Sequence, residues 1–271
     1  MTPGSPLVGF DAAAARFDED ERGNPVLAEM RRQSFAQLSH AFSRGSKLLE
    51  IGSGTGTESA RLVAERGCRV VLADPAAQLL ELAKAKVNAA GDGHLLGAHA
   101  IPAHALGELV REYGPASFDG AFSSFGALNC EPDLGPVAHA LAALVKPGGG
   151  VVLSIINRWC PSEVVWFGLH GEWREAFRRW GGPVLAASYP RGPKDVRTWY
   201  YSRREITRTF ASAFDVERVE AMPLFVPPYL AFLLTRNPRV FEALAPLERW
   251  ASRQRGLCDL GDHVLVRLRR R

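Results

Sequence analysis

Short apolar runs alternate with longer stretches of helical periodicity between residues 47 and 156. The apolar runs have the length of β-strands and cover residues 47–51, 69–73, 95–101, 118–123 and 151–156. Helical periodicity fills the gaps between them, at residues 58–65, 76–89, 105–112 and 134–144. Since apolar strands separated by helices are typical of a parallel sheet with both faces covered, the pattern predicts an α/β fold.

The pattern changes on both sides of this region. Before it, an alanine-rich segment at residues 10–17 and a stretch from Pro25 to about Phe42 predict two helices. After it, the pattern predicts an aromatic-rich helical segment, a strand, a helix, a strand, a second helical excursion and a closing strand, at residues 159–180, 196–201, 203–213, 214–219, 227–255 and 263–268. The two excursions, about 157–195 and 222–258, are expected to form a helical cap near one edge of the sheet.

Composition limits the classes of function. The chain has 271 residues, of which 46% are hydrophobic and 23% charged, enough to bury one full core. Its four cysteines lie far apart, without a Cys-x-x-Cys pair or nearby histidines, so we expect neither a metal site nor a disulfide framework. The sequence shows no leader-like pattern and no unbroken apolar run of membrane-spanning length, which favours a cytoplasmic protein.

The positive charge is concentrated rather than strong. The net charge is +4 and the pI is about 9.0, with arginines gathered at residues 173–180 and 269–271. A solvated helix face and a disordered tail explain these clusters better than a nucleic-acid surface does.

A glycine-rich turn follows the first predicted strand. Residues 48–56 read Leu-Leu-Glu-Ile-Gly-Ser-Gly-Thr-Gly and run from a strand through a turn into a helix. Such a turn brings unpaired backbone N–H groups close to a ligand at the start of a helix. The sixth-position glycine of the dinucleotide fingerprint is missing, and Glu58 would face a pyrophosphate, so NAD and FAD are disfavoured.

Two acids near this turn suit a nucleoside that carries positive charge. Asp74 ends the second predicted strand, 18 residues after Gly56, where a carboxylate can accept hydrogen bonds from both ribose hydroxyls. Glu50 precedes the turn and suits a cationic or amine-bearing ligand better than a phosphate.

These residues resemble class I S-adenosylmethionine-dependent methyltransferases. The resemblance rests on residues 50–56, on Ala73-Asp74-Pro75, and on the segments 117–122 and 144–149, and it covers about residues 10–156. It implies a Rossmann-like, doubly wound, seven-stranded sheet, mostly parallel with a C-terminal antiparallel strand, plus helical cap insertions. Residues 1–156 would hold the N-terminal helices and the cofactor-binding core, and residues 157–271 would complete the sheet and the cap of a single domain.

The resemblance also assigns the cofactor contacts. Gly52, Ser53 and Gly54 would contact the methionine part of S-adenosylmethionine, Asp74 the ribose, and Pro75 with Leu79 the adenine edge, beside the acidic Glu50. Relatives usually carry an acid at the end of the third strand. Here His104 stands in its place, and Ala105 would offer its backbone N–H; a surface histidine is the equal alternative.

The segment after the fourth strand is expected beside the reacting centre, because ligands bind beyond the carboxyl ends of the strands. Ser124 would present its carbonyl to the cofactor, Phe125 would pack on the methionine chain, and Asn129 would orient the acceptor, unless they form a structural turn. Phe17 sits where many relatives have a cofactor-covering tyrosine, and Arg32 is a candidate anchor for the cofactor carboxylate, although it also fits a solvated helix face.

No general base stands out in the sequence. The candidates are Glu163, His170 and His263, each of which also fits a packing or surface role. Trp159, Trp166 and Phe167 are expected to line a greasy acceptor pocket, with interleaved arginines facing an acidic headgroup or a membrane surface. An amphipathic packing helix is the alternative.

The resemblance favours methyl transfer to a small hydrophobic or aromatic acceptor, such as a natural product, a quinone or a lipid-linked compound. It is closer to small-molecule and quinone methyltransferases than to those acting on DNA. The alternatives are an RNA methyltransferase, a module that binds S-adenosylmethionine without turnover, and an NAD dehydrogenase. The acceptor, the methylated atom and the oligomeric state stay open.

Overall fold

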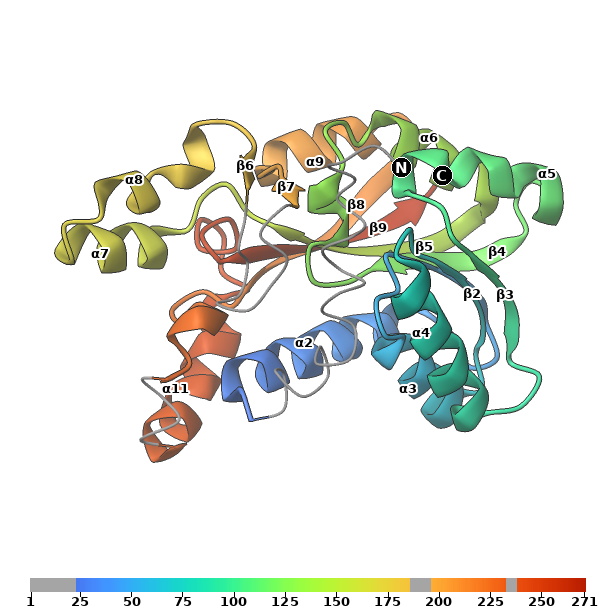
Figure 1. Cartoon of the computed structure of the whole chain (residues 1–271), viewed down its shortest axis with the longest axis horizontal. Coiled ribbons are helices and arrows are strands. Elements are labelled where there is room, and N and C mark those ends of the chain that lie inside the picture. Colours follow the sequence, from blue (N-terminus) through green and yellow to red (C-terminus); the bar gives the residue numbers. More distant parts are fainter. Residues whose placement is uncertain (1–22, 186–195, 233–237) are drawn as a thin grey trace.

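One seven-stranded sheet organises the chain, and helices cover both of its faces (Figure 1). The computed structural model describes residues 23–185, 196–232 and 238–271. The sheet has the order β3-β2-β1-β4-β5-β9-β8. Its strands are β1 (Lys47–Ile51), β2 (Arg69–Ala73), β3 (Leu95–His99), β4 (Phe118–Ser123), β5 (Val145–Ile156), β8 (Phe214–Met222) and β9 (His263–Arg270).

The direction of the strands confirms the predicted fold class. Strands β1 to β5 pair in parallel, while β9 runs antiparallel to both β5 and β8. The order of the strands reverses between β1 and β4, and in such sheets ligands bind at this point, beyond the carboxyl ends of the strands. The fold therefore places the glycine turn after β1 beside the segment after β4.

The two faces of the sheet carry separate cores. One core contains residues of α2 (Pro25–Ala41), α3 (Thr57–Arg66) and α4 (Ala77–Ala90). The opposite core contains residues of η1 (Ala103–Glu108), α5 (Leu109–Tyr113), α6 (Gly135–Leu144) and α9 (Arg203–Phe210). Because successive strand residues face opposite sides, Leu48 lies in the first core and Leu49 in the second. Glu50 accordingly projects toward α2 and α3.

Local sequence explains where two of these helices begin. Asn24 caps α2, because its side-chain oxygen accepts hydrogen bonds from the backbone N–H groups of Val26 and Leu27, both at 3.1 Å. Ser202 and Glu205 form a capping box at the start of α9.

Several predicted boundaries were wrong. The strand predicted at 151–156 starts earlier, because residues 146–150 also belong to β5, which begins at Val145 opposite Phe118 and bulges before Gly120. The strand predicted at 196–201 shrinks to β7 (Arg197–Thr198), which pairs with β6 (Val184–Leu185). The helix predicted at 10–17 lies outside the described residues.

The arginine tail is ordered, contrary to expectation. Arg269 donates to Glu217 at 2.7 Å, and Arg271 donates to Asp215 at 2.9 Å, so two acids of β8 neutralise it. The prediction failed because these partners lie in the neighbouring strand, more than fifty residues earlier in the chain.

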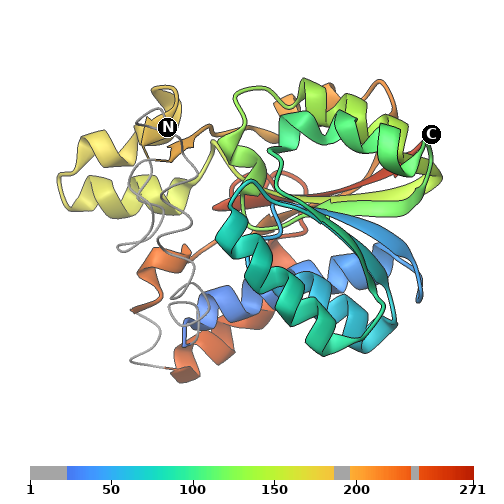
Figure 2. The ribbon, with the colours of Figure 1, turned by 45° about the vertical axis from the view of Figure 1, so that its right-hand side comes forward.

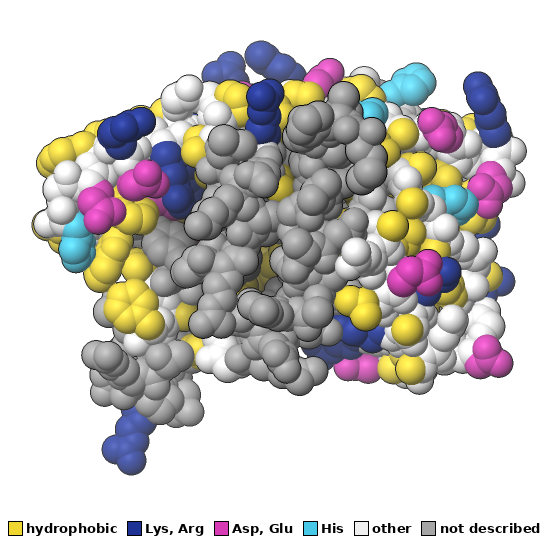
Figure 3. Space-filling model, viewed as in Figure 1, with side chains coloured by type: hydrophobic (Ala, Val, Ile, Leu, Met, Phe, Trp, Pro, Cys, Tyr) yellow, Lys and Arg dark blue, Asp and Glu magenta, His cyan; other side chains and the backbone are white. Residues whose placement is uncertain are grey.

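Helices beyond β5 project from one end of the sheet (Figure 2). They are α7 (Pro161–Leu169), α8 (Trp173–Ala176) and η3 (Arg178–Trp180), while α11 (Pro238–Ala251) lies beside α2. Hydrophobic side chains are exposed at the end of the molecule formed by α7 and α8 (Figure 3), including Leu169, 81% exposed, and Trp173, 60% exposed. Within the described ranges, no helix combines the length and apolar character needed to cross a membrane.

Candidate functional site

The glycine turn after β1 requires glycine at specific positions. Gly52 has a φ of +66°, and a Cβ added there would lie 2.1 Å from the Cβ of Ala127. Gly56 has a φ of +72°, and its added Cβ would lie 2.9 Å from the Cα of Ala83 in α4. Both residues therefore combine a left-handed backbone with close approach of a neighbour, which only glycine tolerates. The turn leads into α3, whose first N–H groups have no side-chain cap.

Asp74 ties the glycine turn to the end of β2. Its Oδ2 accepts a hydrogen bond from the backbone N–H of Gly54 at 2.8 Å, and its Oδ1 accepts one from Ala76 at 2.9 Å. The residue is only 6% exposed. Since each carboxylate oxygen has a second lone pair, the same group can also accept hydrogen bonds from the hydroxyls of a ribose.

Glu50 is a fully buried acid directly beneath the turn. Burial raises the pKa of Glu50 well above its usual value, and the nearby charges of Glu58 and Asp74 add to this shift, while a hydrogen bond from Ser59 opposes it. Arg31 pairs with Glu58, and its charge also opposes the shift of Glu50. The buried Glu50 and Asp74 still disfavour an anion and favour a cation. This arrangement matches a ligand with an ammonium or sulfonium group.

Ser53 provides the clearest sign of a ligand. Its hydroxyl is buried in the glycine turn and has no hydrogen-bond partner among the residues that the structure describes. Buried polar groups are rarely left without a partner, so this hydroxyl is placed for a polar group that binds in the turn. The Lys86 ammonium of α4 donates to the hydroxyls of Thr55 and Thr57, both at 2.9 Å, and so ties the turn to α4.

Arg31, which the sequence interpretation missed, connects α2 to this site. Its guanidinium donates to Glu58 in the first turn of α3 and lies 4.9 Å from the ring centre of Phe125. Arg32, the predicted anchor, instead donates to Glu29 from its Nε at 2.7 Å and is half exposed. Arg31 and Arg32 are consecutive in α2 and point in different directions around the helix axis, so only the folded structure shows which of them reaches the turn. Arg32 as a carboxylate anchor stays a prediction, and Arg31 is the arginine beside the turn.

The segment after β4 crosses close to the glycine turn. Phe125 adopts a left-handed φ of +53°, unusual for a bulky side chain and frequent at ligand sites. Ser124 is buried beside it. Asn129, in η2 (Ala127–Cys130), donates to the carbonyls of Ile156 and Trp199 at 2.9 and 2.6 Å, and accepts from Ile156 N–H. Its amide holds this segment to β5, and its predicted contact with an acceptor is untested.

His104 lies at the predicted adenine side, paired with an acid. Its Nδ1 is 2.9 Å from Glu131 Oε2, and its backbone N–H donates to Glu131 Oε1 at 3.2 Å. The Ala105 N–H, predicted to face adenine, donates to the Pro102 carbonyl at 3.0 Å within η1. Pro75 is half-buried and Leu79 is buried at the start of α4. These adenine contacts stay predictions.

The comparisons with known proteins agree with this geometry. Residues 26–217 match a family model described as a methyltransferase domain. The chain belongs to this methyltransferase family. The predicted methyltransferase family is thereby confirmed, because the match covers more than half of the chain.

Curated relatives of this methyltransferase domain carry names that refer to quinones. It is 33% identical to a ubiquinone biosynthesis O-methyltransferase from Idiomarina loihiensis over 154 residues, covering 56% of this chain and 60% of that protein. It is 31% identical to a demethylmenaquinone methyltransferase from Clavibacter sepedonicus, covering 56% and 58%. The chain thus spans about three-fifths of the length of these relatives.

Solved structures share the fold over nearly the whole methyltransferase chain. A 1,6-didemethyltoxoflavin-N1-methyltransferase from Burkholderia thailandensis, with bound S-adenosylhomocysteine, gives a TM-score of 0.57 at 18% identity, covering 100% of this chain and 92% of that one. A putative methyltransferase in complex with the Haloferax volcanii Trm112 activator gives 0.58 at 16% identity, covering 96% of both. These likenesses concern the fold alone.

Of the three candidate bases, Glu163 and His170 have structural partners that limit their ability to accept a proton. Glu163 is 1% exposed and accepts hydrogen bonds from Arg178 and Arg179. His170 is exposed, and its Nδ1 lies 2.7 Å from the Trp166 carbonyl. His263 is buried, with its Nδ1 2.8 Å from Asp262 Oδ2. Of the three, only His263 joins a buried imidazole to a carboxylate.

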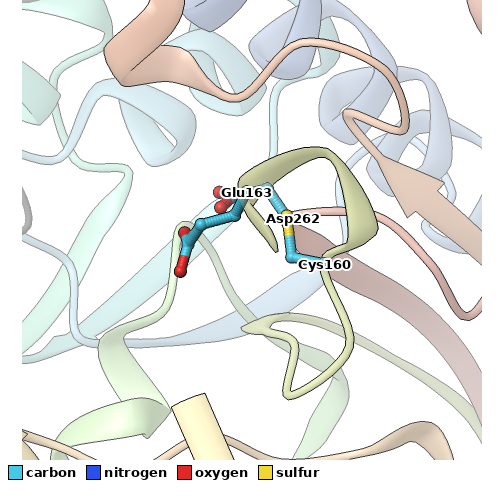
Figure 4. Close-up of side chains that lie close together, drawn as sticks. All are labelled: Cys160, Glu163 and Asp262. Carbon is cyan, nitrogen blue, oxygen red and sulfur yellow. The ribbon is translucent and has the colours of Figure 1, made fainter. Parts of the chain in front are cut away.

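Cys160 and Glu163 of the cap lie close to Asp262, which directly precedes β9 (Figure 4), with side-chain O and S atoms within 4.8 Å of one another. The guanidinium of Arg179 donates to both carboxylates and to the carbonyl of Asn157 at 2.7 Å. The two acids are therefore neutralised by arginine, and the cluster fastens the cap to β5 and β9.

The aromatic residues of the cap divide between two surroundings. Trp166 lies 6.2 Å from Phe232 between ring centres, and Arg178 lies over the ring of Phe167 at 5.7 Å. Trp159 is 45% exposed and packs on Trp180, with 5.1 Å between the ring centres.

An apolar pocket lies between α2, α11 and the segment after β8, and its lining includes Met30, Phe225 and Leu244. The contacts of Trp159, Trp166 and Phe167 with an acceptor stay predictions.

Proposed function

We propose that this chain is an S-adenosylmethionine-dependent methyltransferase that acts on a small hydrophobic or aromatic acceptor. The observation that carries the proposal is the glycine turn itself. In it Asp74 holds Gly54, Glu50 contributes a buried acid, and the Ser53 hydroxyl has no partner among the described residues. The quinone-related names of the curated relatives support an aromatic acceptor.

The residues present fit this cofactor. Gly52, Ser53 and Gly54 would hold its methionine part, and Asp74 its ribose. When bound, S-adenosylmethionine supplies a methyl carbon that is activated by its attachment to a positively charged sulfur. The chain's own part is to align the acceptor with that carbon and to exclude water.

The core would occupy residues 1–156, and the cap segments, about 157–195 and 222–258, would cover the acceptor within a single domain in the cytoplasm. Exposed hydrophobic side chains of α7 and α8, among them Leu169 and Trp173, would allow peripheral contact with a membrane that carries the acceptor.

Calorimetry and a methylation assay together test the function. The purified chain is titrated with S-adenosylhomocysteine and with NADH, and is then incubated with S-adenosylmethionine and a panel of catechol, 4-nitrocatechol, menadiol and 2-octylphenol. We expect binding of S-adenosylhomocysteine, no comparable binding of NADH, and a mass increase of one methyl group in at least one phenol. Tighter binding of NADH would overturn the cofactor assignment. Cofactor binding without any methylated product would favour a non-catalytic module.

A further inference from the structure

His263 lies at the edge of the sheet where the reaction is expected. It is the first residue of β9 and pairs with Ile156, the last residue of β5. Ile156 in turn touches the segment after β4, because a Cβ added to Gly126 would lie 2.7 Å from Ile156 Cγ1. His263 is thus one strand away from the segment that carries Phe125.

The imidazole also faces the same side of the sheet as Phe125. Side chains of a strand alternate between faces, and Leu265, two residues after His263, lies in the core that contains residues of α2. Phe125 packs against that same core. An acceptor placed beside Phe125 therefore has His263 on its own side of the sheet.

Asp262 fixes which nitrogen of the ring is available. Burial raises the pKa of Asp262, but the charge of Arg179 and the hydrogen bond with His263 outweigh it and lower the pKa below its usual range. The ionised carboxylate only accepts hydrogen bonds, so the His263 Nδ1 at 2.8 Å must carry the proton. Nε2 then holds a lone pair, and no hydrogen bond occupies it within the described part of the chain.

The groups around this pair balance in charge. Arg179 of η3 donates to Asp262 and Glu163, and Arg178 donates to Glu163 as well. Cys160 lies beside them, and burial raises the pKa of its thiol to about 11. From β8, uncharged Met222 is the residue opposite His263. Two arginines thus neutralise the two carboxylates that lie beside the imidazole.

We propose that His263 is the general base for a hydroxyl acceptor, such as a phenol, and that Arg179 positions it through Asp262. The inference rests on the proposed function. His263 Nε2 takes the hydroxyl proton while the oxygen forms a bond to the methyl carbon. The carbon–sulfur bond breaks with its electron pair going to sulfur, which leaves S-adenosylhomocysteine, and the imidazolium later releases its proton to water. An ionised carboxylate behind the ring stabilises that imidazolium, as in hydrolase triads.

The first test measures the ring itself. Nitrogen NMR of wild-type protein labelled with ¹⁵N-histidine and bound to S-adenosylhomocysteine is compared with that of His263→Gln, which assigns the His263 signals. We expect Nδ1 protonated and Nε2 unprotonated at neutral pH. Replacing Arg179 with lysine should change the nitrogen chemical shifts of this ring, because Asp262 then loses the guanidinium that orients it. A ring protonated on Nε2 alone would overturn the proposal.

The second test compares acceptors of different acidity in wild type, His263→Gln and the matched control His139→Gln, which changes an exposed histidine of α6. His263→Gln should lower kcat for catechol about 100-fold or more, in the range of general-base catalysis. The loss should be much smaller for the more acidic 4-nitrocatechol and should diminish at high pH, while affinity for S-adenosylhomocysteine stays at the wild-type value. His139→Gln should match wild type in every assay.

Equal losses for both acceptors would indicate a structural role and overturn the base. Cofactor binding without methylation of any phenol would also overturn it while leaving the cofactor site intact. Absence of S-adenosylhomocysteine binding in wild type would instead reject the proposed function.

Discussion

Asp74 accepts a hydrogen bond from the backbone N–H of Gly54, twenty positions earlier in the chain, at 2.8 Å. The contact is possible because β1 and β2 are parallel neighbours, so the segments that follow them meet at one edge of the sheet. Its consequence is a glycine turn that is already held in shape by a carboxylate before any ligand arrives. A preformed site loses less entropy when it binds.

Replacing Asp74 with asparagine should weaken binding of S-adenosylhomocysteine about 10- to 100-fold. Hydrogen bonds to a charged group contribute about 1.5–3 kcal/mol each, and asparagine keeps one acceptor oxygen while turning an NH₂ group toward an N–H donor. Calorimetry measures the effect. Asp92→Asn, in the exposed turn after α4, is the matched control. Wild-type affinity in Asp74→Asn would contradict the assigned role of the carboxylate.

Gly52→Ala should lower the free energy of unfolding by about 1–3 kcal/mol and abolish cofactor binding. The left-handed φ of +66° disfavours a side chain, and the added Cβ would lie only 2.1 Å from the Cβ of Ala127. Denaturant unfolding and calorimetry report the two effects separately. Gly181→Ala serves as control, since its added Cβ meets nothing within 4 Å and its φ is −84°. If the two variants proved equally stable, the turn would not be as tightly packed as described.

The sequence alone predicted the parts of the site that depend on neighbours in the chain. The glycine turn and Asp74 follow strands whose apolar pattern is plain, so their placement at one edge of the sheet follows from the fold. Contacts between distant segments were not predictable in this way. Examples are Glu131 beside His104 and Arg31 beside Glu58.

Asn129 illustrates the same limit. Its amide donates to the carbonyls of Ile156 and Trp199, which only the folded chain brings near, while its predicted contact with an acceptor stays a prediction. The partnership of Arg179 with Glu163 and Asp262 likewise joins the cap to the final strand. Sequence patterns specify which face of an element is apolar, but they do not specify which charged groups meet across a core.

Arg179→Met should destabilise the protein by about 3–5 kcal/mol, because it leaves two buried carboxylates without their shared partner. Thermal and denaturant unfolding measure the change. Arg174→Met, on the exposed side of α8, should stay within about 0.5 kcal/mol of wild type. Arg179→Lys should recover only part of the loss, since an ammonium cannot bridge both acids as a planar guanidinium does. Equal stability of all three variants would show that the cluster does not anchor the cap.

Glu50 should make both stability and cofactor binding depend on pH. Its pKa is raised in the folded state, so the folded protein binds the proton more tightly than the unfolded chain. That contribution to stability is fully present below the unfolded value of 4.5 and is lost as the pH rises through the raised pKa. Wild type should therefore lose stability relative to Glu50→Gln over this range. Denaturant unfolding of both proteins from pH 4 upward measures the difference.

The positive charge of S-adenosylmethionine should oppose this shift, because a nearby cation favours the ionised carboxylate and lowers its pKa. Binding should then release a proton from Glu50 in wild type, and the apparent affinity should rise with pH until the acid ionises without the ligand. Calorimetry in buffers of different ionisation enthalpy detects the released proton, and the signal should vanish in Glu50→Gln. S-adenosylhomocysteine, which lacks the sulfonium charge, should release less. If both ligands released the same number of protons, and Glu50→Gln released as many as wild type, the titrating group would be another residue. Glu50 would then not belong to the cation site.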